Sequence, residues 1–211
     1  MRFKNRVEAG QKLAEKLLKY KNEDAVVFAL PRGGVILGYE IAKSLDAPLD
    51  LVITRKIGHP FNPEYAVCVI AEDGHIICNE RERAALDPKW LKKAVEKEQK
   101  EAKRRREVYL KNRKSADVQN KTAILVDDGI ATGLTFLLAV REIKEQNPQK
   151  IIAAIPIAPP DAALTIKKEV DEFVALDTPT DYLGAVGAYY DEFPQVEDKE
   201  VINLLKAAQK I

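Results

Sequence analysis

The 211-residue sequence has no long hydrophobic run, almost no net charge and few cysteines. No stretch approaches the roughly 18 consecutive apolar residues that suggest a membrane-spanning helix. Residues 1–12 are charged throughout and lack the apolar centre of a signal peptide. We therefore expect a cytoplasmic protein with no membrane partner. The 34 Lys and Arg residues against 33 Asp and Glu give a net charge of +1, which argues against a surface that is basic overall and built to bind nucleic acid.

The two cysteines are too few for a disulfide framework or a metal cluster. They lie in segment 66–78, AVCVIAEDGHIIC, which predicts a hairpin with its Asp-Gly dipeptide at the tip. If Glu72 faces His75 across this hairpin, Cys68 and Cys78 lie on opposite faces, because side chains alternate along a strand. We therefore expect two buried free thiols rather than a disulfide.

Apolar runs rich in β-forming residues alternate along the chain with segments of helical periodicity. Strands are expected at 25–30, 49–54, 123–126, 151–157 and 173–176, and helices at 2–20, 35–45 and 134–146. This alternation predicts a single α/β domain over residues 1–211, with a mostly parallel central sheet covered by helices on both faces. Ligands of such sheets bind beyond the carboxyl ends of the strands, which directs attention to the residues after Leu30, Thr54 and Val126.

The segment at about 79–115 differs in composition from the rest of the chain. Asn79–Lys114 contains eight Lys and six Arg against six Glu and one Asp, a net charge of +7, so the remainder carries −6. Pro88 suits a first helical turn, and Trp90–Arg113 has no Gly or Pro, so we expect a helix of about six turns. Three roles stay open for this basic insertion: a solvated helix with i,i+4 ion pairs, a contact with RNA or DNA, or a contact with a second subunit in a homodimer.

The most informative segment is AILVDDGIATGLT, residues 123–135. A buried strand ends in two adjacent acids, Asp127 and Asp128, and a turn of small residues then opens into a helix. The backbone N–H groups of a helix start, beside the hydroxyls of Thr132 and Thr135, suit a phosphate monoester. The two acids are placed to accept hydrogen bonds from the vicinal hydroxyls of a sugar. The segment therefore presents the polar outline of ribose 5-phosphate, although an ordinary acidic turn before a capped helix is the alternative.

This segment resembles the signature of the type I phosphoribosyltransferase family, which has four apolar residues, two acids and a small-residue turn ending in Thr-Gly-x-Thr/Ser. It is not a P-loop, because no Gly-Lys-Thr/Ser follows and the acids precede the turn. The whole chain is most like phosphoribosyltransferase-like proteins that have a Pro-Arg-Gly-Gly loop, a basic helical insertion and a Gly-Ala-Tyr-Tyr ending. The resemblance implies the type I phosphoribosyltransferase fold, with a helical insertion at about 79–115 and a small C-terminal hood at about 177–211.

The activity implied by the resemblance is Mg²⁺-dependent transfer of ribose 5-phosphate in nucleotide metabolism. The donor would be 5-phosphoribosyl 1-pyrophosphate, and pyrophosphate would be released. Mg²⁺ is expected to bind mainly through this donor, so no protein ligand is assigned to it. Asp127, Asp128 and Lys56 are the expected catalytic residues, since they would hold the ribose hydroxyls and neutralise the leaving group.

The resemblance also assigns binding residues. Ribose 5-phosphate would bind to Asp127, Asp128, Gly129, Ile130, Ala131, Thr132, Gly133, Leu134 and Thr135. Glycines that let the backbone approach an anion, together with cations that pair with it, would bind pyrophosphate: these are Arg32, Gly33, Gly34, Arg55 and Lys56.

Two further segments resemble family features. Gly58–Pro63 is similar to the mobile loop that closes over the reaction centre, where we expect His59 to be a loop residue rather than a general base. The hood would offer Tyr189, Tyr190 and Phe193 as stacking faces for the acceptor, although an aromatic cluster packed on the sheet is equally compatible with the sequence.

The acceptor is not identified by the sequence, and a nucleobase is one candidate. In family members that act on 6-oxopurines, an Asp before the Thr-Gly of the motif contacts the purine. Ala131 stands at that position here, which disfavours a 6-oxopurine of the usual kind. A second hypothesis is a non-catalytic regulatory protein that senses the donor and contacts nucleic acid through the basic insertion.

Overall fold

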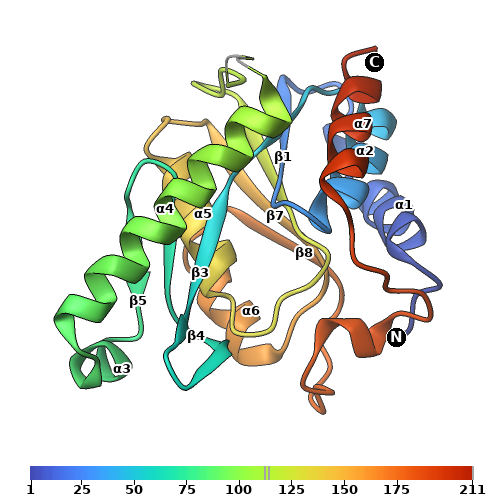
Figure 1. Cartoon of the computed structure of the whole chain (residues 1–211). Coiled ribbons are helices and arrows are strands. Elements are labelled where there is room, and N and C mark those ends of the chain that lie inside the picture. The colour runs from blue at the N-terminus through green and yellow to red at the C-terminus, as the bar shows by residue number, and fades with distance from the viewer. Residues whose placement is uncertain (112, 114, 211) are drawn as a thin grey trace.

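The computed structural model describes residues 1–111, 113 and 115–210. Residues 112, 114 and 211, which fall in the predicted insertion and at the end of the predicted hood, lie outside the described residues. Five parallel strands form the central sheet in the order β2-β1-β6-β7-β8 (Figure 1). Their bounds are β1 Ala25–Ala29, β2 Leu49–Leu51, β6 Thr122–Val126, β7 Lys150–Ile157 and β8 Glu172–Asp177.

Helices cover both faces of this sheet because its strands are apolar on both faces. Alternate residues of β1 pack into two different clusters, Val27 and Ala29 on one face and Val26 and Phe28 on the other. The first face is covered by α1 Arg6–Leu17, α2 Gly34–Leu45 and α7 Asp198–Ala208, and the second by α5 Leu134–Lys144 and α6 Pro160–Lys167. Short 3₁₀ turns occur at η1 Leu18–Tyr20 and η2 Val186–Tyr189. The predicted α/β fold with a parallel sheet is confirmed.

A second, antiparallel sheet stands beside the first, in the order β3-β4-β5. Its strands are β3 Thr54–His59, β4 Asn62–Ala71 and β5 Ile76–Cys78. Gly58–Pro63, which was expected to be a loop, is the end of the β3-β4 hairpin. The pairing of β3 with β4 is irregular at Gly58, where a bulge lets the two strands continue to the turn. Only glycine fits there, because a Cβ would lie 2.1 Å from the carbonyl oxygen of Pro63. Phe61 at the tip is 92% exposed, and closure of the hairpin over the reaction centre stays a prediction.

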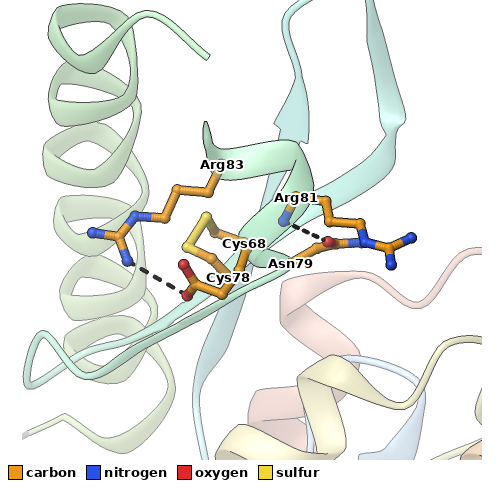
Figure 2. The surroundings of a disulfide bond; sticks show 6 residues. Cys68, Cys78, Asn79, Arg81 and Arg83 are labelled. Carbon is orange, nitrogen blue, oxygen red and sulfur yellow. Dashed lines mark hydrogen bonds and ion pairs between the residues drawn. A yellow bond between two sulfur atoms is a disulfide. The ribbon is translucent and has the colours of Figure 1, made fainter. Parts of the chain in front are cut away.

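The prediction of two free thiols was also wrong. Cys68 lies directly opposite Cys78 and forms a disulfide with it, with the two Cα atoms 4.0 Å apart (Figure 2). The N–H of Ala71 donates to the carbonyl of His75, so three residues form the turn instead of the expected two. Gly74, with φ +106°, supplies the positive φ that such a turn needs. A change of one residue in register moves a side chain to the other face of the sheet. Cys68 and Cys78 therefore lie on the same face, whereas a two-residue turn would have placed them on opposite faces.

The basic insertion forms two helices, α3 Glu80–Ala85 and α4 Pro88–Leu110. Pro88 opens α4, and the side chain of Asp87 caps it by accepting from the N–H of Lys89 at 2.9 Å. The helix therefore begins at Pro88, as expected, and ends at Leu110, before Arg113. It packs against β3 and β4 (Figure 1). Its buried residues are Ala102, Tyr109 and Leu110. Among the described residues, no helix is long and apolar enough to cross a membrane.

Candidate active site at the carboxyl ends of the strands

A cavity of about 420 Å³ lies where β1 and β6 end and β3 begins. All three segments singled out in the sequence contribute to it. Its lining comprises Arg6, Leu30, Pro31, Arg32, Gly33, Thr54, Arg55, Lys56, Arg105, Asp127, Asp128, Gly129, Ile130, Ala131, Thr132, Gly133, Thr135, Phe136, Val186 and Phe193. Four residues of the predicted site do not line this cavity: Gly34, Leu134, Tyr189 and Tyr190.

The two adjacent acids occupy the end of β6. Asp127 accepts a hydrogen bond from the backbone N–H of Asp128 at 2.8 Å. Burial, and then the neighbouring charge of Asp128, raise the pKa of Asp127 well above its ordinary value. Burial also raises the pKa of Asp128, against the lowering effect of the Arg6 guanidinium. Burial and mutual repulsion therefore disfavour the state in which both acids carry a negative charge.

Arg6, which the sequence analysis missed, pairs with Asp128. Its Nε lies 2.7 Å from Asp128 Oδ2, and its terminal nitrogen donates to the carbonyl of Pro194 at 2.7 Å. The guanidinium also lies 3.6 Å from the centre of the Phe193 ring, and the residue is only 7% exposed. One local signal existed: Arg6 is in the first turn of a helix, an end at which a cation is disfavoured.

Glycines let the loop after β1 approach the acids closely. A Cβ on Gly33 would lie 1.9 Å from Asp128 Oδ2, and a Cβ on Gly34 would lie 2.9 Å from the carbonyl oxygen of Val126 and 3.0 Å from the Cα of Asp127. The 1.9 and 2.9 Å distances are too short for a side chain. The two glycines are therefore needed because the loop after β1 packs closely on the segment that carries the two acids. The sequence had suggested only that they let the backbone approach a bound anion.

The predicted phosphate turn connects β6 to α5. Gly129 and Gly133 both have positive φ, at +154° and +81°, which favours glycine. A Cβ on Gly129 would also lie 2.4 Å from Val186 Cγ1. The first turn of α5 directs unpaired N–H groups toward this turn, as any helix start does. The turn and the acids therefore both line the cavity.

Four cationic side chains line the cavity in addition to Arg6. Three were predicted: Arg32, Arg55 and Lys56. Arg55 donates from Nε and a terminal nitrogen to Glu98 Oε2 of α4, at 2.9 and 2.8 Å. The fourth, Arg105, also comes from α4, and no motif in the sequence linked that helix to the site. The basic insertion therefore forms part of the wall.

The aromatic residues of the predicted hood have different positions. Tyr189 and Tyr190 are 4% and 3% exposed and pack in the core, so their prediction as stacking faces was wrong. The hydroxyl of Tyr190 donates to the backbone carbonyl of Asp128 at 2.6 Å. The alternative of a packed aromatic cluster is confirmed for these two tyrosines. Phe193 does line the cavity, together with Val186.

Neither histidine lines the cavity. His59 is at the end of β3, and its Nδ1 accepts from the N–H of Phe61 at 3.3 Å. His75 is exposed beside the hairpin tip, with its Nδ1 2.8 Å from Asp73 Oδ2. The geometry offers no histidine base for the chemistry of this cavity.

Comparison with known proteins identifies the family of this chain. The family model described as the phosphoribosyl transferase domain matches residues 2–192. Two curated proteins of Mycobacterium tuberculosis strains, provisionally named phosphoribosyl transferases, are each 38% identical over 99% of this chain. The chain spans about half of their length, 47%. A solved structure from Thermus thermophilus is 36% identical, covers 97% of this chain and 98% of its own, and superposes with a TM-score of 0.80. The chain belongs to the phosphoribosyl transferase domain family.

Proposed function

We propose that the cavity binds 5-phosphoribosyl 1-pyrophosphate and that the chain transfers its ribose 5-phosphate to an acceptor. The observation that supports this most is the convergence of three segments, distant in sequence, on one cavity of about 420 Å³. Its acids, its phosphate turn and its cations correspond to the hydroxyls, the monophosphate and the pyrophosphate of that donor.

In this proposal each group of residues contacts one part of the donor. Asp127 and Asp128 accept hydrogen bonds from the ribose hydroxyls, and the turn at 129–135 binds the 5-phosphate. Arg32, Arg55 and Lys56 neutralise the pyrophosphate as it leaves. The bond between the anomeric carbon and the pyrophosphate oxygen breaks, its electron pair leaves with pyrophosphate, and a lone pair of the acceptor forms the new bond.

The residues present also fit Mg²⁺. Among the described residues that line the cavity, Asp127 and Asp128 are the only carboxylates, and hard oxygen ligands suit this ion. The cations at the pyrophosphate end offer no ligand, so the two acids and the donor itself would hold the metal. Bound there, Mg²⁺ would neutralise negative charge on the donor.

The acceptor in this proposal is a planar base. Ile130, Val186 and Phe193 are apolar residues that line the cavity, and planar heterocycles bind to apolar surfaces. Ala131 also lines the cavity and provides no carboxylate to contact a 6-oxopurine.

The test is a panel of purines, pyrimidines and their analogues, incubated with the donor and Mg²⁺ while pyrophosphate release is measured. Release that depends on one base would identify the acceptor and establish catalysis. Release should be lost in Asp128→Asn. Tight donor binding with no release across the panel would favour a regulatory protein, and absence of donor binding would refute the proposal.

The regulatory alternative has one specific observation in its favour. The exposed Lys97, Lys100 and Lys103 of α4 line a hollow of about 690 Å³ next to Arg55. Nucleic acid bound there would lose affinity steeply as salt rises. Undetectable RNA and DNA binding at low salt would refute this alternative.

A further inference from the structure

The α4 helix is held against the body of the protein on two sides. On one side Gln99 donates to the carbonyl of Glu72, at 3.4 Å, and Arg106 forms an ion pair with the Glu72 carboxylate, at 3.0 Å. Further along the helix, the hydroxyl of Tyr109 donates to Asp198 of α7 at 2.6 Å. These contacts place α4 in a defined orientation in front of β3 (Figure 1).

Helical geometry then directs Arg105 inward. Ala102 and Tyr109, three residues before and four residues after it, are both buried, and residues at these spacings share one face of a helix. The Arg105 side chain is 16% exposed and lines the cavity with the three predicted pyrophosphate-binding cations. Its neighbour Arg104 is 49% exposed and does not line the cavity.

Both arginines pair with the same carboxylate. Arg104 bonds to Glu101 through two nitrogens, at 2.7 and 2.9 Å, whereas Arg105 uses only Nε, at 3.0 Å. These hydrogen bonds, those of Arg104 first, lower the pKa of Glu101 to about 2. Within the described part of the chain, the hydrogen bonds of Arg105 thus involve Nε alone, and its two terminal nitrogens remain for a ligand in the cavity.

We propose that Arg105 of the insertion helix is a pyrophosphate-binding residue that stabilises the leaving group, which rests on the proposed function of this cavity. Arg105 then donates to pyrophosphate oxygens while Nε keeps its bond to Glu101. The guanidinium can contact two oxygens at once. Because the negative charge on pyrophosphate grows as the bond to the anomeric carbon breaks, this contact is stronger in the transition state than in the bound donor.

The experiment compares Arg105→Met with Arg104→Met as the matched control, since both variants remove an arginine from the same helix and from the same carboxylate. Binding of inorganic pyrophosphate, of 5-phosphoribosyl 1-pyrophosphate and of ribose 5-phosphate is measured with Mg²⁺ by calorimetry. Loss of a charge-assisted contact should weaken binding of pyrophosphate and of the donor by about 10- to 100-fold in Arg105→Met. Ribose 5-phosphate, which has no pyrophosphate group, should bind as it does to the wild type.

The outcomes separate the two proposals. Arg104→Met should bind all three ligands normally, and Arg105→Lys, which keeps the charge without the fork of nitrogens, should lose less affinity than Arg105→Met. Unchanged pyrophosphate binding in Arg105→Met, or an equal loss for ribose 5-phosphate, would overturn the role of Arg105 while leaving the proposed function intact. A wild-type chain that binds neither pyrophosphate nor the donor would overturn both. If Arg105→Met does not fold, the same comparison is made with Arg105→Lys and Arg104→Lys.

Discussion

Removal of Arg6 should destabilise the protein strongly, because its partner Asp128 would remain buried without a counter-charge. The two side chains are only 9% and 16% exposed, and Nε lies 2.7 Å from Oδ2. Loss of one member of such a pair costs about 3–5 kcal/mol. Arg6→Met also removes the guanidinium from the Phe193 ring and its hydrogen bond to the Pro194 carbonyl, so a double-mutant cycle is needed to isolate the contribution of the ion pair.

The assay is a double-mutant cycle by urea denaturation. Arg6→Met and Asp128→Asn are each measured alone and then together. The double variant removes both charges, so its free energy of unfolding should exceed the value expected from additivity by about 2 kcal/mol or more. Arg2→Met is the control, since the Arg2–Asp191 pair comes from the same segment but is exposed, at 66% and 56%, and should contribute less than about 1 kcal/mol.

Additivity of Arg6→Met and Asp128→Asn within about 0.5 kcal/mol would refute this reasoning, because contacting charges must couple. A loss in Arg2→Met as large as that in Arg6→Met would also contradict it. Binding of the donor gives a second measurement. Arg6→Met should weaken it, because the Asp128 carboxylate loses the contact that holds it in the proposed ribose site.

Three more predictions concern other parts of the structure. Gly33→Ala should abolish donor binding while the chain stays folded, since the new methyl group would lie 1.9 Å from Asp128 Oδ2 and displace that carboxylate; calorimetry and circular dichroism test this, and normal donor binding would contradict it. Burial raises the pKa of Glu142 from 4.5 to about 8, so stability should fall as pH rises between these values. Glu142→Gln should then match the wild type near pH 4 and exceed it by an amount on the order of 3 kcal/mol at pH 7 in urea titrations, whereas a gain that does not depend on pH would count against the burial of a charge. Reduction of the Cys68–Cys78 disulfide, which closes a loop across a sequence separation of 10, should cost about 3 kcal/mol by loop entropy; an unchanged melting temperature in reductant would show that the bridge contributes nothing.

Much of the site was predictable because its parts are local. A strand that ends in two acids, a turn of small residues and a helix start are all specified within AILVDDGIATGLT. The parallel sheet then brings this segment beside the loop after β1, because parallel strands present their carboxyl ends at one edge. Asp127, Asp128 and Arg32 were found in this way. Arg55 and Lys56 were expected to follow a strand at 49–54, but they lie in β3 of the second sheet and still line the cavity.

The errors concern relations between segments. The hairpin at 66–78 was recognised from its alternation, but its register depended on whether two or three residues form the turn. Tyr189 and Tyr190 were expected to face a ligand, yet they pack in the core against residues near the N-terminus, with Phe3 and Tyr190 rings 5.3 Å apart. Local composition does not specify which partner an aromatic side chain meets.

The sequence by itself determined the fold class, the phosphate turn and the paired acids, since backbone propensities and the alternation of apolar residues act over short distances. It also showed a helix with net positive charge, but not where that charge would lie. Only the tertiary structure brought Arg6 to Asp128 across 122 residues and Arg105 of the insertion to the same cavity. The physical reason is that an ion pair requires no particular spacing along the chain. It requires two charges that the packing of separate elements places a few ångströms apart.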